Sequence, residues 1–283
     1  MRHDDFRDRF RRLCVDQLGP SMGPRVAALL RNGYTLHATE LGQAPTGRCR
    51  LGGPALLDPG HAWPESEDGP MTLLAVMDLD ALAPGLNVAL PEGAGVLNFF
   101  FAGDGDNFDT YSGDFVFVFE DEWDWKVVPA ATDTAVQVAP PPTALALPAR
   151  PLRAEPVLAL PDPESAFERH KQDPEEFTVW KAFVQVAARL QEIVDAGPDP
   201  EAWPFLNVPQ AFVEDMVYGH RAFGWPWSMP GDPWPDEHRV LLLQLDSLDD
   251  LRWANGGTVT FDVDAAGLRE GDFSRVDCYI AWC

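Results

Sequence analysis

Apolar residues recur at helical spacing near the start of the chain. One stripe runs through Phe6, Phe10, Leu13 and Leu18, and a second, shorter stripe of Val26, Leu29 and Leu30 ends near Gly33. Side chains that recur every three or four positions share one face of a helix. The spacing therefore predicts a helical segment over residues 1–40.

A longer apolar stripe follows Asp173-Pro174 and ends before Gly197-Pro198. Asp is a good N-cap, Pro suits the first helical turn, and Gly-Pro ends a helix. The stripe consists of Phe177, Trp180, Phe183, Val184, Ala187, Leu190 and Val194. We predict a helix over residues 174–196 whose apolar face packs on a sheet, and a shorter helix from Gln210 to Tyr218.

Elsewhere the pattern changes to short apolar runs separated by Gly, Pro and Asp, which is typical of buried strands. Residues 73–77 and 96–101 are two such runs. Residues 115–119 and 123–128 form two more on either side of an acidic cluster, which predicts a β-hairpin. Residues 140–163 contain eight prolines, which disfavour both helix and central strand and predict an extended crossing segment or linker.

Several strand motifs occur twice in the same order. Residues 242–246 repeat the pattern of residues 74–78, and residues 257–261 repeat that of residues 95–99. We interpret the repeat as an internal duplication, with chance similarity of short apolar runs as the alternative. The predicted fold is α+β, with two related sheet-containing halves packed as one compact domain. Its segments are the N-terminal helical segment 1–40, a first half 41–139, the Pro-rich crossing 140–163, a connecting helix 164–198 and a second half 199–283.

The same motifs resemble the YwqG-like family, a bacterial group of unknown function. The first half matches through Gly52-Gly53-Pro54, Trp63-Pro64 and residues 73–79, and the second through residues 241–247, 253–257 and 272–276. Val76 stands where the family usually has Gln, and Asn255 stands where it usually has Asp. The resemblance covers residues 50–283 and implies an α+β fold with a duplicated sheet-based core, without an established reaction.

Charge limits the classes of partner. The chain has 21 Lys and Arg against 45 Asp and Glu, a net charge of −24, which argues against nucleic acid and anionic membranes. No apolar run reaches the ~18 residues of a membrane span. The four cysteines form no Cys-x-x-Cys pair and are expected to be reduced, and residues 1–5 do not begin an apolar signal core. We expect a cytoplasmic protein.

The negative charge is concentrated in one stretch. Residues 51–149 hold one basic residue, Lys126, against sixteen acidic ones, and the densest cluster is Glu120, Asp121, Glu122 and Asp124. A solvated turn explains such a cluster. Alternatively, it forms an acidic surface that attracts a basic protein partner.

Motifs for catalysis, cofactors and metals do not emerge. The sequence has no Gly-x-Ser-x-Gly, Walker or Gly-x-Gly-x-x-Gly motif, and no two histidines lie four apart. The Asp-rich loop at residues 103–109 departs from the EF-hand pattern at Phe108 and Phe115. We therefore expect no metal and no cofactor.

Two small groups of residues are candidate sites. Asp78 and Asp246 each end an apolar strand, so they either cap the next turn or form a cleft site with Gln244 and His220. The Trp-rich segment 223–235 either packs into the core or lines a groove for a peptide or ligand. Trp225 is expected to be structural, whereas Trp227 and Trp234 are expected to be accessible for binding.

Our leading hypothesis from the sequence is a non-catalytic binding protein that presents an acidic surface to a basic protein. The alternative is an enzyme or small-molecule binder with its site in the cleft between the two halves.

Overall fold

The computed structural model describes residues 3–103, 108–109, 114–117, 123–161, 174–196, 206–207, 219–227, 238–247, 251–253 and 257–281. The chain divides into two compact units. Unit 1 comprises Met1–Tyr34, Pro156–Tyr218 and Phe223–Glu237, and unit 2 comprises Thr35–Glu155, Gly219–Ala222 and His238–Cys283. The chain passes between the units within single strands, since residues 31–38 and 150–159 each form one strand.

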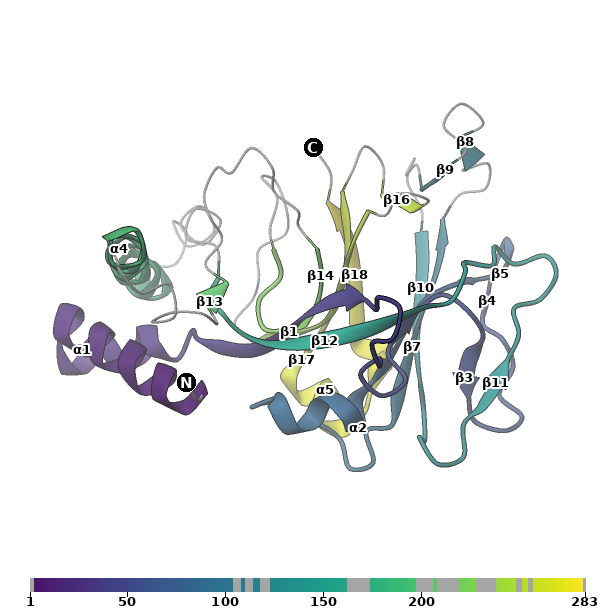
Figure 1. The fold of residues 1–283 in the computed structure, drawn as a ribbon, viewed down its shortest axis with the longest axis horizontal. Helices are drawn as coiled ribbons and strands as arrows, with labels where there is room; N and C mark the ends of the chain where they lie inside the picture. Colours follow the sequence, from purple (N-terminus) through teal and green to yellow (C-terminus); the bar gives the residue numbers. More distant parts are fainter. Residues whose placement is uncertain are drawn as a thin grey trace. The chain divides into compact units, whose positions relative to one another are not determined.

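Most described strands belong to one large sheet (Figure 1). Its order is β10-β7-β6-β2-β12-β1-β14-β15-β17-β18, and β13 (Leu206–Asn207) pairs in parallel with β12. The pairs β10–β7, β7–β6, β6–β2, β2–β12, β14–β15, β15–β17 and β17–β18 are antiparallel. The strands in sequence order are β1 (Arg31–Ala38), β2 (Arg50–Leu51), β6 (Thr72–Asp78), β7 (Val96–Gly103), β10 (Trp123–Ala130), β12 (Arg150–Ala159), β14 (His220–Phe223), β15 (Arg239–Asp246), β17 (Thr258–Asp264) and β18 (Val276–Ala281).

Three smaller sheets complete the described strands. β3 (Ala55–Leu57) pairs with β11 (Val136–Val138), and β4 (Glu65–Ser66) pairs with β5 (Gly69–Pro70). β9 (Asp114–Phe117) lies between β8 (Phe108–Asp109) and β16 (Leu251–Trp253). The β3–β11 pair provides one wall of the pocket described below.

Helices are few among the described residues. α1 (His3–Ala27) is interrupted at Gly19, which has φ 77° and ψ 176°. The others are α2 (Leu79–Leu82), α4 (Pro174–Ala196) and α5 (Ala265–Glu270), with short 3-10 turns at Ala83–Gly85 and Phe273–Arg275. None of the described helices is long and apolar enough to cross a membrane.

The core of unit 1 joins α1 to α4 (Figure 1). Phe6 and Phe10 of α1 are fully buried in the same cluster as Trp180 and Phe183 of α4. Trp180 packs edge-on against Phe183, with ring centroids 5.8 Å apart. Burial of large aromatic side chains is the main favourable contribution to such helix pairs.

The core of unit 2 is formed by the buried faces of its strands. Phe99 of β7 packs edge-on against Phe261 of β17 at 5.2 Å, and Phe101 packs against Trp253 at 5.7 Å. Trp125 of β10 donates its indole N–H to the Val276 carbonyl at 2.8 Å, which ties the first strand of the sheet order to the last.

The predicted fold class is wrong. The chain does not form two duplicated α+β halves joined by a helix, because strands from both predicted halves belong to one mainly antiparallel sheet. The helix over residues 174–196 is present at the predicted boundaries, but it packs against α1 and does not connect two sheet-based halves. Short apolar runs repeat wherever antiparallel strands are buried, so the repeat reflects a shared strand pattern.

The Pro-rich segment contains a central strand that the sequence did not predict. β12 includes Pro151 and Pro156, and it lies between β2 and β1 in the sheet order. Pro lacks an N–H donor but keeps its carbonyl, and the Pro151 carbonyl accepts a hydrogen bond from Thr39 at 3.0 Å. The prolines of β12 therefore remove fewer hydrogen bonds between strands than the number of prolines in residues 140–163 suggested.

Two other predictions from local pattern are also wrong. Residues 31–38 form strand β1 and not part of a helix, since Tyr34 and Leu36 are buried at alternate positions. The runs at 115–119 and 123–128 do not form a hairpin, because β9 pairs with β8 and β16 while β10 pairs with β7. The predicted helix at Gln210–Tyr218 lies outside the described residues.

Candidate functional site

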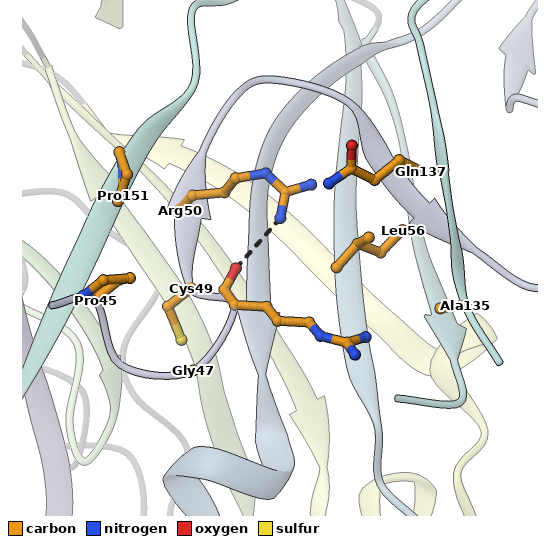
Figure 2. Close-up of a pocket in the computed structure, with 9 residues that line it drawn as sticks. Pro45, Gly47, Cys49, Arg50, Leu56, Ala135, Gln137 and Pro151 are labelled. Carbon is orange, nitrogen blue, oxygen red and sulfur yellow. Dashed lines mark hydrogen bonds between the residues drawn. The ribbon is translucent and has the colours of Figure 1, made fainter. Parts of the chain in front are cut away.

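One pocket in unit 2 brings together two arginines from neighbouring positions in the chain. It has a volume of about 380 Å³ and lies between the loop before β2, the β3–β11 pair and the start of β12. We call it the arginine pocket (Figure 2). Its lining residues are Pro45, Gly47, Arg48, Cys49, Arg50, Leu56, Ala135, Gln137 and Pro151.

The loop that carries Arg48 is fixed by backbone hydrogen bonds. Arg48 donates its backbone N–H to Asp78 Oδ2 at 2.9 Å. The Cys49 backbone N–H donates to the Thr46 carbonyl at 3.0 Å, and the Cys49 carbonyl accepts from the Leu152 backbone N–H at 2.9 Å. Gly47 has φ 53°, and a side chain at this position would collide with the Asp78 carboxylate. Glycine therefore lets the loop approach β6 closely enough for Asp78 to hold it.

The Arg50 side chain is held in place by two backbone carbonyls. Its guanidinium donates to the Pro54 carbonyl and, at 3.3 Å, to the Arg48 carbonyl. In Figure 2 the Arg50 guanidinium points toward the Gln137 side-chain amide, with Leu56 beside them. Burial and the neighbouring charge of Arg48 lower the pKa of Arg50, so its positive charge lies in an environment that an anion would stabilise.

Arg48 and Arg50 lack the ionic partners that several other arginines of unit 2 have. Arg239 pairs with Asp262 and Asp277, and Arg275 pairs with Asp264 at 2.7 Å. Within the described parts of the chain, no carboxylate forms an ion pair with Arg48 or Arg50. The pocket therefore holds two guanidinium groups that form no ion pair with a described carboxylate, while the nearby Asp78 carboxylate bonds to the Arg48 backbone.

The cysteine that lines the pocket is a buried, unreactive thiol. Cys49 is 1% exposed, and its Sγ accepts a hydrogen bond from the Asp78 backbone N–H at 3.3 Å. Burial raises the pKa of Cys49 to about 11, so the thiol is protonated near neutral pH. The thiolate, and not the thiol, is the nucleophile in cysteine chemistry. Cys49 therefore lines the pocket without acting as a nucleophile.

Three of the four cleft residues named from the sequence lie on β14 and β15. His220 Nδ1 accepts a hydrogen bond from the Asp246 backbone N–H at 3.0 Å, and Asp246 Oδ2 accepts one from the Gly219 backbone at 2.8 Å. Gln244 is 1% exposed and donates to Thr260 Oγ1 at 3.1 Å. These three side chains therefore use polar atoms for hydrogen bonds within the protein.

Electrostatics around His220 favour the neutral ring. Burial, followed by the charges of His37 and Arg150, lowers the pKa of His220 to about 4. Burial raises the pKa of Asp246, although its hydrogen bonds and the Arg221 charge act in the opposite direction. Burial also lowers the pKa of Arg221 to about 10. The group is an internal polar network that links neighbouring strands.

Asp78 does not join the other three residues. It is 5% exposed and caps α2 through a 3.0 Å hydrogen bond from Ala81 to Oδ1, while Oδ2 holds Arg48. The capping role expected for Asp78 is thus confirmed. Asp78 and Asp246 share none of their hydrogen-bond partners.

The aromatic and acidic candidates are only partly described. Trp225 is 1% exposed and donates its indole N–H to the Leu29 carbonyl at 2.6 Å, as expected of a structural residue. Trp227 is partly exposed, whereas Trp234 lies outside the described residues. Asp124 is exposed, and Glu120, Asp121 and Glu122 lie outside the described residues. No group of three or more His, Cys, Asp or Glu side chains in the described ranges is arranged to hold a metal ion.

Arg48 and Arg50 were not among the residues predicted from the sequence. They are separated by one position, with Arg48 in the loop before β2 and Arg50 at its first residue. They also immediately precede the stretch in which Lys126 is the only basic residue. Leu56, Ala135, Gln137 and Pro151 complete the pocket from more distant positions in the chain, and their proximity to the arginines was not predictable from local pattern.

The fold and the pocket define a protein built on one mainly antiparallel sheet with an arginine-lined cavity. The chain belongs to the family described as Domain of unknown function (DUF1963), whose family model matches residues 49–283. The match includes Arg50 and the later walls of the pocket, and it begins after Arg48. No curated protein is significantly similar to the chain.

Proposed function

We propose that the protein is a binding protein for a small anionic ligand, which occupies the arginine pocket. The observation that carries the proposal is the presence of Arg48 and Arg50 on one concave surface without a described carboxylate partner. Guanidinium groups recognise carboxylates and phosphates through paired N–H donors. The pocket volume of about 380 Å³ lies within the range of small-molecule sites, about 300–1,000 Å³.

The chemistry of the lining favours binding over catalysis. None of the nine lining side chains is a carboxylate or an imidazole, which are the usual groups for proton transfer near neutral pH. The Cys49 thiol is buried and protonated. The residues offer charge and shape to a ligand, without an evident general acid, general base or activated nucleophile.

Thermal unfolding in simple anions tests this proposal. At a fixed ionic strength, inorganic phosphate or acetate in place of chloride is expected to raise the Tm of the wild-type protein. Arg48→Gln should abolish the increase, because it removes one of the two positive charges of the pocket. The Arg48 side chain is exposed and forms no ion pair within the described residues, so the variant should still fold. Arg189→Gln, which removes the same charge from the exposed face of α4, should keep the increase.

Two results would contradict the proposal. One is a Tm that is the same in chloride, acetate and phosphate. The other is an increase of equal size in the wild type and Arg48→Gln, since binding would then occur elsewhere on the protein.

An acidic surface that binds a basic protein is a second proposal. It rests on the charge of residues 51–149 and on exposed carboxylates such as Glu67, Asp68, Asp124 and Asp133. Clustered charge attracts an oppositely charged partner and makes association sensitive to salt. Pull-down from lysate at about 50 mM and about 500 mM NaCl should recover basic proteins only at the lower salt concentration. Recovery of the same partners at both concentrations would argue against electrostatic recognition.

We further infer a YwqG-like membership within the family from the ordered motifs at residues 52–54, 63–64, 73–79 and 241–247. We also propose a cytoplasmic location. In support, Cys14, Cys49 and Cys278 are free, buried thiols, as is common in a reducing compartment.

A further inference from the structure

The apolar walls of the arginine pocket narrow the class of ligand, and this inference rests on the proposed anion-binding function. We infer that the ligand is a small monocarboxylate with an apolar body. The carboxylate would contact Arg48 and Arg50, and the apolar body would cover Pro45, Leu56, Ala135 and Pro151.

The donors suit a planar, bidentate group. A guanidinium has five N–H donors in a fixed plane. Arg50 uses two of its groups on the Pro54 and Arg48 carbonyls, which hold the plane in place and leave other donors for a ligand. A carboxylate matches paired N–H donors of this kind, and a side chain that is already positioned loses less entropy when it binds.

The walls of the arginine pocket include apolar side chains, which an inorganic anion such as phosphate would not contact favourably. In Figure 2, Pro45 and Pro151 lie on one side of Arg50, while Leu56, Ala135 and Gln137 lie on the other. Pro45 and Pro151 are exposed and Ala135 is partly exposed, so a ligand would remove apolar surface from water. Such burial is the main favourable term for the body of a small ligand. Gln137 adds an amide at the edge of the pocket for a polar substituent.

The overall charge favours a single negative charge on the ligand. The protein carries a net charge of −24, so a ligand is repelled at long range in proportion to its own negative charge. A phosphate group carries about −1.5 to −2 near neutral pH. A monocarboxylate carries −1 and can gain the rest of its affinity from apolar contact, which the net charge does not oppose.

Isothermal titration calorimetry at constant ionic strength tests the inference with four probes: acetate, hexanoate, hexanamide and inorganic phosphate. Hexanoate is expected to bind at least about tenfold more tightly than acetate, the gain from burying about two of its four additional methylene groups. Hexanamide has the same apolar body without the charge and should not bind measurably. Phosphate should bind more weakly than hexanoate.

A pair of matched variants locates the binding. Ala135→Asp places a negative charge in the pocket and should abolish hexanoate binding. Ala139→Asp makes the same change at an exposed position outside the lining and should leave binding within about twofold. If Ala135→Asp fails to fold, Arg48→Gln provides the same test at an exposed residue and should weaken hexanoate binding at least tenfold.

The outcomes separate this inference from the proposed function. If phosphate and acetate bind in an Arg48-dependent manner but hexanoate gains nothing over acetate, the monocarboxylate inference is wrong and anion binding stands. If none of the probes binds in an Arg48-dependent manner, both are wrong. Equal loss of hexanoate binding in Ala135→Asp and Ala139→Asp would also overturn the inference, because a general charge effect would then explain it.

Discussion

At the scale of single residues, Asp78 links the fold to the candidate site. One carboxylate oxygen caps α2 through Ala81, and the other holds the backbone of Arg48 at the pocket. The side chain is buried, so its loss would leave two N–H donors without these acceptors. The same residue therefore contributes to stability and to the shape of the pocket.

Replacing Asp78 measures its contribution to stability. We expect Asp78→Ala to lower the free energy of unfolding by about 2 kcal/mol, the combined effect of a lost helix cap and an unpaired buried donor. Asp78→Asn keeps a carbonyl acceptor of similar size and should lose less. Urea denaturation followed by circular dichroism measures both changes. Equal stability of Asp78→Ala and the wild type would show that the two hydrogen bonds contribute nothing.

His220 makes the stability depend on pH. Its Nδ1 accepts from the Asp246 backbone N–H, and burial, followed by the charges of His37 and Arg150, lowers its pKa to about 4 from an ordinary value of 6.5. Between these values the unfolded chain takes up a proton that the folded chain does not. The contribution of His220 is thus complete above pH 6.5 and is lost as the pH falls to about 4, by about 3 kcal/mol in total.

The measurement is the free energy of unfolding between pH 4 and 7.5 for the wild type and His220→Gln. The wild type should lose more stability than the variant as the pH falls through this window. Carboxylates common to both proteins largely cancel in the difference. Parallel curves for the two proteins would mean that His220 titrates alike in the folded and unfolded states.

At the scale of elements, Trp225 anchors the segment after β14 to the helices of unit 1. Its ring packs edge-on against Trp180 of α4 at 6.1 Å, and the Arg31 guanidinium lies 3.5 Å from its ring centre. Gly33 approaches Phe223 and Gly224 so closely that an added Cβ would lie 2.9 Å from their backbone atoms. These contacts position the end of β14 against the start of β1.

Substitutions in this segment distinguish anchoring from surface residues. Trp225→Ala should lower the free energy of unfolding by about 3–5 kcal/mol, as large-to-small changes in a core do. Trp227 is partly exposed, so Trp227→Ala should cost less than about 1 kcal/mol. Chemical denaturation of both variants tests the difference. Equal, large losses would assign Trp227 to the core and remove it from the candidate binding residues.

At the scale of the whole molecule, the excess negative charge opposes the compact state. The chain carries a net charge of −24, and residues 51–149 alone carry −15. Repulsion among like charges weakens as salt shortens the range of electrostatic interactions from about 30 Å at 0.01 M to about 8 Å at 0.15 M. Salt also weakens ion pairs such as Arg275–Asp264, but these pairs involve fewer charges than the repulsion among the excess carboxylates.

We therefore expect the Tm to rise by a few degrees when NaCl increases from about 10 mM to about 150 mM. Differential scanning calorimetry measures the change, and an equal osmolarity of an uncharged solute is the control. A Tm that falls with salt would show that the ion pairs outweigh the repulsion.

The sequence determined the features that depend on neighbouring residues. The helix at 174–196 followed from its cap, stripe and terminator, and the strands at 72–78 and 96–103 followed from continuous apolar runs. The capping role of Asp78 was one of two roles predicted, because a short carboxylate at the end of a strand can accept hydrogen bonds from the next turn. Trp225 was also predicted to be structural, and it is buried with its indole N–H bonded, although the internal repeat behind that prediction is wrong.

The tertiary structure decided which strands pair and which side chains meet. β10 pairs with β7 and not with β9, although both choices satisfy the same apolar pattern. The arginine pocket combines residues from position 45 to position 151, and β12 enters the sheet despite its prolines. Periodicity specifies the face that a strand buries, whereas its partner is selected by backbone hydrogen bonds and burial between residues distant in the chain. For this reason Arg48 and Arg50 emerged as a site only once their neighbours were in place.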